Sequence, residues 1–144
     1  MTTTAAIAQA LVADLNVHPF SLAFTAVRAY LPVYDLGEMS ALHVTVVPVG
    51  RTLQPATRTL LQIDHRVEIA IQQKVAVEMV TAGDPVLALV EEIADHLAGH
   101  RLAGTPEAQW VKTEHLPFVA AEHLNDLRQI TSVVAVTYRT WESR

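Results

Sequence analysis

The amino-acid sequence predicts an α+β domain with an N-terminal helix, a mostly antiparallel sheet of about five strands, and one amphipathic helix packed on the sheet. Segments in which apolar and polar residues alternate follow one another along the chain, and helix-like segments precede and interrupt them. No repeat or low-complexity tract divides the sequence. We therefore expect the 144 residues (1–144) to form a single domain, which buries roughly two-thirds of its unfolded surface.

The first element is predicted as a helix over residues 5–15, with the threonines at 2–4 as possible N-caps. Pro19 ends this segment because it disfavours helical geometry at His18. Leu11 and Leu15 are its expected core anchors. One side of the helix carries Ile7, Leu11, Asp14 and Leu15.

Three strands are predicted next. The first falls within 20–34 and ends near Leu31 and Pro32, before a turn at 35–38. The second is 41–49, with Pro48 at an edge or an end, and a polar loop follows at 50–56. The third lies within 58–77 and alternates most clearly over 66–71. The second and third strands would form an antiparallel hairpin with a long loop between them.

The amphipathic helix is predicted over residues 84–99. Asp84 suits the N-cap, Pro85 suits the first helical position, and Gly99 can adopt the left-handed turn that ends a helix. The apolar stripe, about 100° wide, is formed by Val86, Leu89, Val90, Ile93 and Leu97. This stripe needs a sheet or another helix to cover it.

Two strands close the chain. The segment 109–116 predicts a short strand with Trp110, Lys112 and Glu114 on one side, and 117–125 is irregular. The segment 128–141 is rich in β-branched and aromatic residues, which predicts a long or central strand. An exposed edge on such a strand would favour association.

Composition narrows the class of function. The chain is 51% hydrophobic and 17% charged, with a net charge of −5 and no cysteine. It has no run of basic residues, which disfavours tight nucleic-acid binding, and no apolar run that could span a bilayer. The first residues lack the positive start of a signal peptide, so export is not expected. Low charge fits a surface that copies of the chain or other partners cover in part.

Histidines are the first candidates for chemistry. His96 and His100 are four residues apart, as metal ligands on one helical face can be, but Gly99 is expected to end the helix between them. We therefore interpret both as solvent-facing residues at a helix C-terminus. Asp64 and His65, just before the predicted strand, are interpreted as a loop pair.

The other candidate groups also have structural explanations. Glu91, Glu92 and Asp95 could act in acid–base chemistry, but on the polar side of a helix they favour a solvated or partner-facing surface. The serines and glycines do not form a nucleophile elbow or a phosphate-binding loop. Three aromatic residues are expected to be core or interface anchors: Trp110, Tyr138 and Trp141. We expect no cofactor, no metal and no catalytic residue.

Four segments together resemble one group of viral proteins: ALHVTVVPVGRT (41–52), IDHRVEIAIQQKV (63–75), ALVEEIADHL (88–97) and RQITSVVAVTYRTWE (128–142). They are similar to the tail terminator, or tail completion, proteins of tailed phages and prophages. The resemblance extends over most of the chain but includes no catalytic motif. The fold it implies agrees with the order of elements predicted above.

The resemblance implies a non-enzymatic virion protein assembled in the host cytoplasm. It would form a ring, expected to be a hexamer, that caps the head-proximal end of the tail tube. The implied partners are copies of itself, the tail tube protein and the head–tail connector proteins. The interface candidates are Arg51 and Arg58 in the predicted loop 50–59, and Glu91 and Asp95 on the acidic helix face.

Two alternatives remain open. A head–tail connector or neck adaptor would share this composition and assembly logic. A small cytoplasmic enzyme or ligand-binding domain would instead need a deep pocket with converging polar groups.

Overall fold

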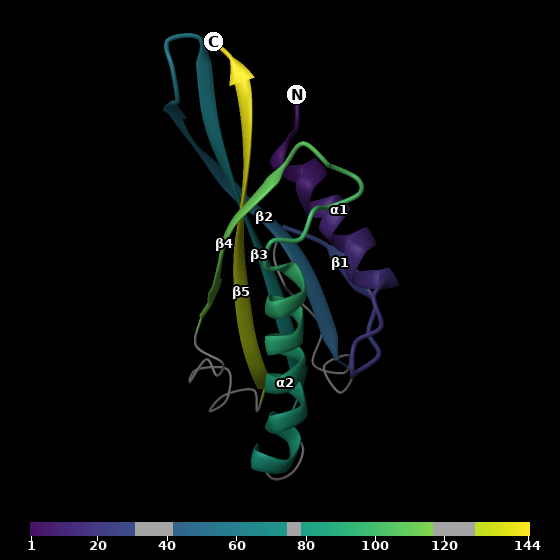
Figure 1. Cartoon of the computed structure of the whole chain (residues 1–144). Coiled ribbons are helices and arrows are strands. Elements are labelled where there is room, and N and C mark those ends of the chain that lie inside the picture. The colour runs from purple at the N-terminus through teal and green to yellow at the C-terminus, as the bar shows by residue number, and fades with distance from the viewer. Residues whose placement is uncertain (31–41, 75–78, 117–128) are drawn as a thin grey trace.

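The computed structural model describes residues 1–30, 42–74, 79–116 and 129–144. Its elements are α1 (Thr4–Val17), β1 (Ala26–Arg28), β2 (His43–Pro55), β3 (Leu60–Lys74), α2 (Met79–Leu97), β4 (Gln109–His115) and β5 (Gln129–Ser143). The strands form one sheet in the order β1-β2-β3-β5-β4, in which only the β1–β2 pair is parallel. Both helices cover one face of this twisted sheet (Figure 1). The predicted α+β class is confirmed.

Helix α1 begins where the threonines predict. Thr3 is its N-cap, and its hydroxyl accepts a hydrogen bond from the Ala6 backbone N–H at 3.1 Å. The helix continues to Val17, and His18 is the extended residue at its C-terminal end. The predicted anchors Leu11 and Leu15 are both buried in the core.

Of residues 20–30, the described part of the predicted first strand, Ala26–Arg28 forms the strand β1 that pairs with the sheet. The aromatic rings before it pack instead of alternating, because Phe20 and Phe24 stack at 5.5 Å and lie against the core. The side chain of Asn16 accepts from the Ala26 N–H and donates to the Ala26 carbonyl, at 2.7 and 3.1 Å. The predicted strand end and turn at 31–38, and the irregular segment 117–125, lie outside the described residues.

The prediction of a loop at 50–56 is wrong, because most of this segment belongs to a strand. Strand β2 continues through Gly50 to Pro55, and one extra residue forms a β-bulge between Pro48 and Gly50. Before the bulge, even-numbered residues such as Val46 face the helices. After the bulge, odd-numbered residues such as Arg51 and Leu53 lie on that face. A bulge reverses the alternation, so the sequence pattern falsely indicated the end of a strand.

A second bulge changes β4. It lies between Trp110 and Lys112, so these two residues face opposite sides of the sheet, contrary to the prediction. Trp110 is opposite the buried Tyr138, and its indole N–H donates to the Thr113 hydroxyl at 2.9 Å. Trp110 therefore packs toward the core while Lys112 faces solvent.

Helix α2 starts earlier than predicted. It includes Met79 to Leu97, so Asp84 and Pro85 lie inside it and do not begin it. A proline within a helix removes one backbone hydrogen bond, so helix propensity alone disfavours Pro85 at this position. The predicted end is confirmed, because Gly99 has a φ of 69° and the His100 N–H donates to the Leu97 carbonyl at 3.0 Å.

The apolar stripe of α2 is confirmed as the part of the helix that meets the core. Its five residues are 0–1% exposed: Val86, Leu89, Val90, Ile93 and Leu97. Each such burial is worth about 1.5–3 kcal/mol, several times an exposed ion pair. Packing of this stripe therefore explains why α2 tolerates Pro85.

Candidate subunit interface and the Asp14 cluster

Three strands extend beyond the helices as a projection that we call the β-arm, residues 50–64 and 139–143 (Figure 1). Strand β1 pairs with β2 only at Val44–Val46, and β4 pairs with β5 only as far as Arg139. Within the described residues, both edges of the β-arm therefore lack a partner strand. Unpaired N–H and C=O groups on an edge are able to pair with another chain.

The β-arm exposes a large apolar side chain on each of its faces. Leu53 is opposite Ile63 on the helix-side face and is 45% exposed. Trp141 is opposite Gln62 on the other face and is 41% exposed. The exposed part of each side chain would need another surface to bury it.

The arginines Arg51 and Arg58 both belong to the β-arm and are both exposed. Arg51 lies in β2, not in a loop, and is opposite His65. Arg58 lies in the tight connection between β2 and β3, where the Ala56 N–H donates to the Leu60 carbonyl at 2.9 Å. The structure thus places both candidates on one projection.

Asp64 and His65 are not a loop pair, because both lie within β3. Asp64 accepts two hydrogen bonds from the Arg139 guanidinium, at 2.7 and 3.2 Å. His65 is fully buried, and each ring nitrogen is 2.9 Å from a threonine hydroxyl, Thr4 or Thr140. These contacts join the base of the β-arm to α1 and β5.

The three acidic residues Glu91, Glu92 and Asp95 of α2 have different surroundings. Glu91 and Asp95 are exposed, as predicted. Glu92 instead accepts hydrogen bonds from the Ser21 backbone N–H, at 3.2 Å, and from the Ser21 hydroxyl. Glu92 therefore joins α2 to the segment before β1, and Glu91 and Asp95 remain available to a partner.

The interpretation of His96 and His100 as solvent-facing residues is wrong. The His96 Nε2 is 2.7 Å from one carboxylate oxygen of Asp14, and the His100 Nε2 is 2.8 Å from the other. The side chains of Asp14 and His96 are only 16% and 15% exposed. We call these three residues the Asp14 cluster.

The turn at Gly99 creates the Asp14 cluster. Its left-handed geometry folds the chain back, so the ring centroids of His96 and His100 are 4.5 Å apart although the helix has ended. The buried Tyr138 hydroxyl donates to the His100 carbonyl at 3.4 Å, which connects the turn to β5. Asp14 reaches the two histidines from the last turn of α1.

Sequence reasoning missed this cluster because Asp14 is 82 and 86 residues from the two histidines. One signal was available. An aspartate on the apolar side of α1, beside Leu11 and Leu15, needs a buried polar partner.

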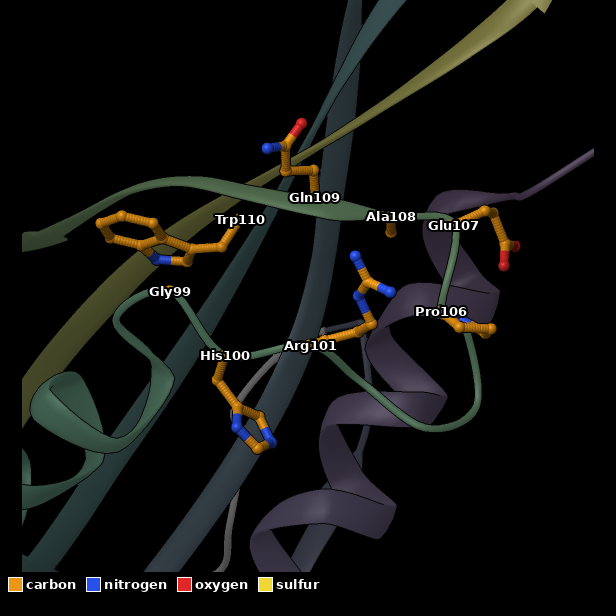
Figure 2. A pocket seen from close by; sticks show the side chains of 8 residues that line it. All are labelled: Gly99, His100, Arg101, Pro106, Glu107, Ala108, Gln109 and Trp110. Carbon is orange, nitrogen blue, oxygen red and sulfur yellow. The ribbon is translucent and has the colours of Figure 1, made fainter.

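A pocket of about 380 Å³ lies between the turn after α2 and the start of β4. Figure 2 shows Arg101 in the space below Gln109, whereas His100 points away from the pocket. The pocket and the Asp14 cluster thus lie on different sides of this turn. The polar residues in its lining include Arg101, Glu107 and Gln109.

None of the helices in the described part of the chain has the length and apolar character needed to cross a bilayer. No protein-family model matches the chain. No curated protein matches it either. The similar solved structures include a chain of the "Virion of native gene transfer agent (GTA) particle", with 16% identity and a TM-score of 0.48 over 98% of this chain and 94% of that chain. A TM-score this low does not establish a shared fold.

Proposed function

We propose that the protein is a structural component of a tailed-phage or related virion, and specifically a tail terminator. Copies of the chain form a ring, a hexamer, at the head-proximal end of the tail tube, where it stops tube polymerisation and offers a surface for head joining. The observation that carries this proposal is the β-arm. In the part of the chain that the structure describes, it has free edges on both sides and an exposed apolar side chain on each face.

The strand lengths support an assembly role. Strands β2, β3 and β5 have 13, 15 and 15 residues, whereas a strand of about 5–6 residues is usual. The additional length forms the β-arm, in which only Ile63 and Thr140 are buried. A protein that stays monomeric normally shortens or covers such an edge, because it invites pairing with other chains.

The charges suggest how neighbours would align. Arg51 and Arg58 lie on the β-arm, and Glu91 and Asp95 lie on α2, which extends in the opposite direction (Figure 1). A contact between these two surfaces is heterologous, and such contacts close into a ring when the rotation between neighbours fits. Exposed pairs contribute about 0–1 kcal/mol each, so they set the alignment while Leu53 and Trp141 supply affinity.

In this proposal, termination follows from the two different faces of the ring. One face matches the last ring of the tail tube, and the other face does not support addition of a further tube subunit. The second face is then free for the connector of the head.

The particles produced by a phage or prophage without this gene test the proposal. Electron microscopy should show overlong tails, because tube growth is no longer stopped. Normal tails beside unjoined heads would contradict termination and indicate a neck adaptor. Complementation with the unchanged gene is the control.

A further inference from the structure

We propose that the Asp14 cluster is a binding site for a divalent transition-metal ion, Zn²⁺ in the first place, held by Asp14, His96 and His100. This site is independent of the proposed assembly role. It lies at the junction of α1 and α2, below the β-arm, and includes none of the residues proposed for the interface.

The donor set is the first argument. Two imidazoles and one carboxylate suit Zn²⁺ and related transition metals, whereas Mg²⁺ and Ca²⁺ prefer sets made only of oxygen. The three ligand atoms, one from each residue, all lie within 4.8 Å of one another. Ligands at about 2.0–2.1 Å from a tetrahedral ion are separated by about 3.3 Å. Small side-chain movements are sufficient to receive the ion.

The present hydrogen bonds are the second argument. Each carboxylate oxygen of Asp14 accepts from a different imidazole Nε2, so the carboxylate and both Nε2 atoms already face one another. Binding of Zn²⁺ through Nε2 would displace the proton there, and exchange with solvent would place that proton on Nδ1, so each imidazole remains neutral. The same helix ends and turn would hold the ion, and their backbone would not need to move.

The backbone that holds the ligands is fixed by other contacts. His96 is in the last turn of α2 beside the buried Leu97, and His100 is held by the Gly99 turn and by Tyr138. Rigid supporting elements favour metal binding because little order must be gained when the ion arrives. Partial exposure of the His100 side chain, 33%, gives the ion a path from solvent.

A fourth ligand is close. The ring centroid of His18 is 3.9 Å from that of His96, and His18 is exposed, so its side chain can rotate. Phe20 packs near both rings, with its ring centroid 4.5 Å from that of His18 and 5.6 Å from that of His96. Either His18 or a water molecule completes the tetrahedron. The ion would link the C-terminal ends of α1 and α2.

Isothermal titration of the full-length, metal-free protein with ZnCl₂ tests the proposal. We expect one ion per chain and a higher melting temperature in its presence, because the ion binds the folded state. MgCl₂ should give neither effect. In Asp14→Asn and His96→Gln variants, affinity should fall by at least about 10–100-fold, the range observed when only a ligand's outer partner is lost.

His115→Gln is the matched control, since His115 bonds Ser132 outside the cluster and its loss should leave Zn²⁺ affinity unchanged. A tetrahedral absorption spectrum with Co²⁺, lost in Asp14→Asn, gives a readout that does not depend on stability. Failure of the unchanged protein to bind Zn²⁺ would overturn the proposal. So would equal affinity in folded Asp14→Asn protein. Ring assembly is measured separately, so the two proposals can fail independently.

Discussion

At the scale of single residues, buried polar side chains find partners that are distant in sequence. His65 lies between Thr4 and Thr140, and Asp14 lies between two histidines. Burial, and to a smaller extent the nearby charge of Arg51, lowers the pKa of His65 from its ordinary value of 6.5. Glu142 and Asp64 oppose this shift only in part.

The pKa of His65 predicts a pH dependence of stability. The unfolded chain binds a proton at His65 as the pH falls below 6.5, while the folded chain does so only at lower pH. The free energy of unfolding should therefore fall between pH 6.5 and the lower folded pKa. Urea unfolding across this range measures it.

The comparison variant is His65→Gln, which should show a shallower fall over the same range, whereas His115→Gln should keep the slope of the unchanged protein. An equal slope in His65→Gln would contradict this assignment.

The charges of the proposed interface give a second prediction at this scale. Changing Arg51 and Arg58 to glutamate should lower the fraction of assembled rings, because like charges would then meet across the contact. Adding Glu91→Arg and Asp95→Arg to the same chain should restore assembly in part. Analytical ultracentrifugation measures this. No restoration would contradict the proposed alignment of neighbours.

At the scale of elements, the stability of α2 depends more on the burial of its apolar stripe than on a capping residue at its N-terminus. The stripe, from Val86 to Leu97, is fully buried, and Asp84 is an exposed residue within the helix. Leu89→Ala should lower the free energy of unfolding by about 2–5 kcal/mol. Asp84→Ala should change it by less than about 0.5 kcal/mol, since Asp84 caps no helix end. A large loss in Asp84→Ala would contradict the early start of α2.

Gly99 gives a separate prediction for the same helix. At a φ of 69°, an alanine is strained by about 1–2 kcal/mol, although its Cβ would have no atom within 4 Å. Gly99→Ala should lower stability by that amount, measured by denaturant unfolding. Gly50→Ala is the control, because a Cβ at Gly50 also has no atom within 4 Å and the backbone there is not in the left-handed region.

The sequence was sufficient to predict the class of fold, the order of helices and strands, and the buried stripe of α2. It was not sufficient at 48–50 or 110–112, because one extra residue in each strand reverses the alternation on which strand prediction depends. The Asp14 cluster could not be predicted from local spacing. It requires the C-terminal ends of α1 and α2 to meet (Figure 1), which only the packing of the whole core determines.

At the scale of the whole molecule, the core that stabilises the fold is distinct from the β-arm, where Leu53 and Trp141 are exposed and only Ile63 and Thr140 are buried. Leu53→Ser combined with Trp141→Ser should therefore leave the melting temperature nearly unchanged but prevent ring formation. Val17→Ser is the matched control, because Val17 is 80% exposed and lies on α1 away from the β-arm. A double variant that still forms rings would exclude the β-arm from the contact.

The most direct test of the central proposal adds the purified protein to polymerising tail tube protein from the same particle. We predict a ring whose mass is six times the 15.8 kDa of the chain, and tubes that stop growing once one end carries this ring. A protein that remains monomeric at high concentration and leaves the tubes growing freely would contradict it.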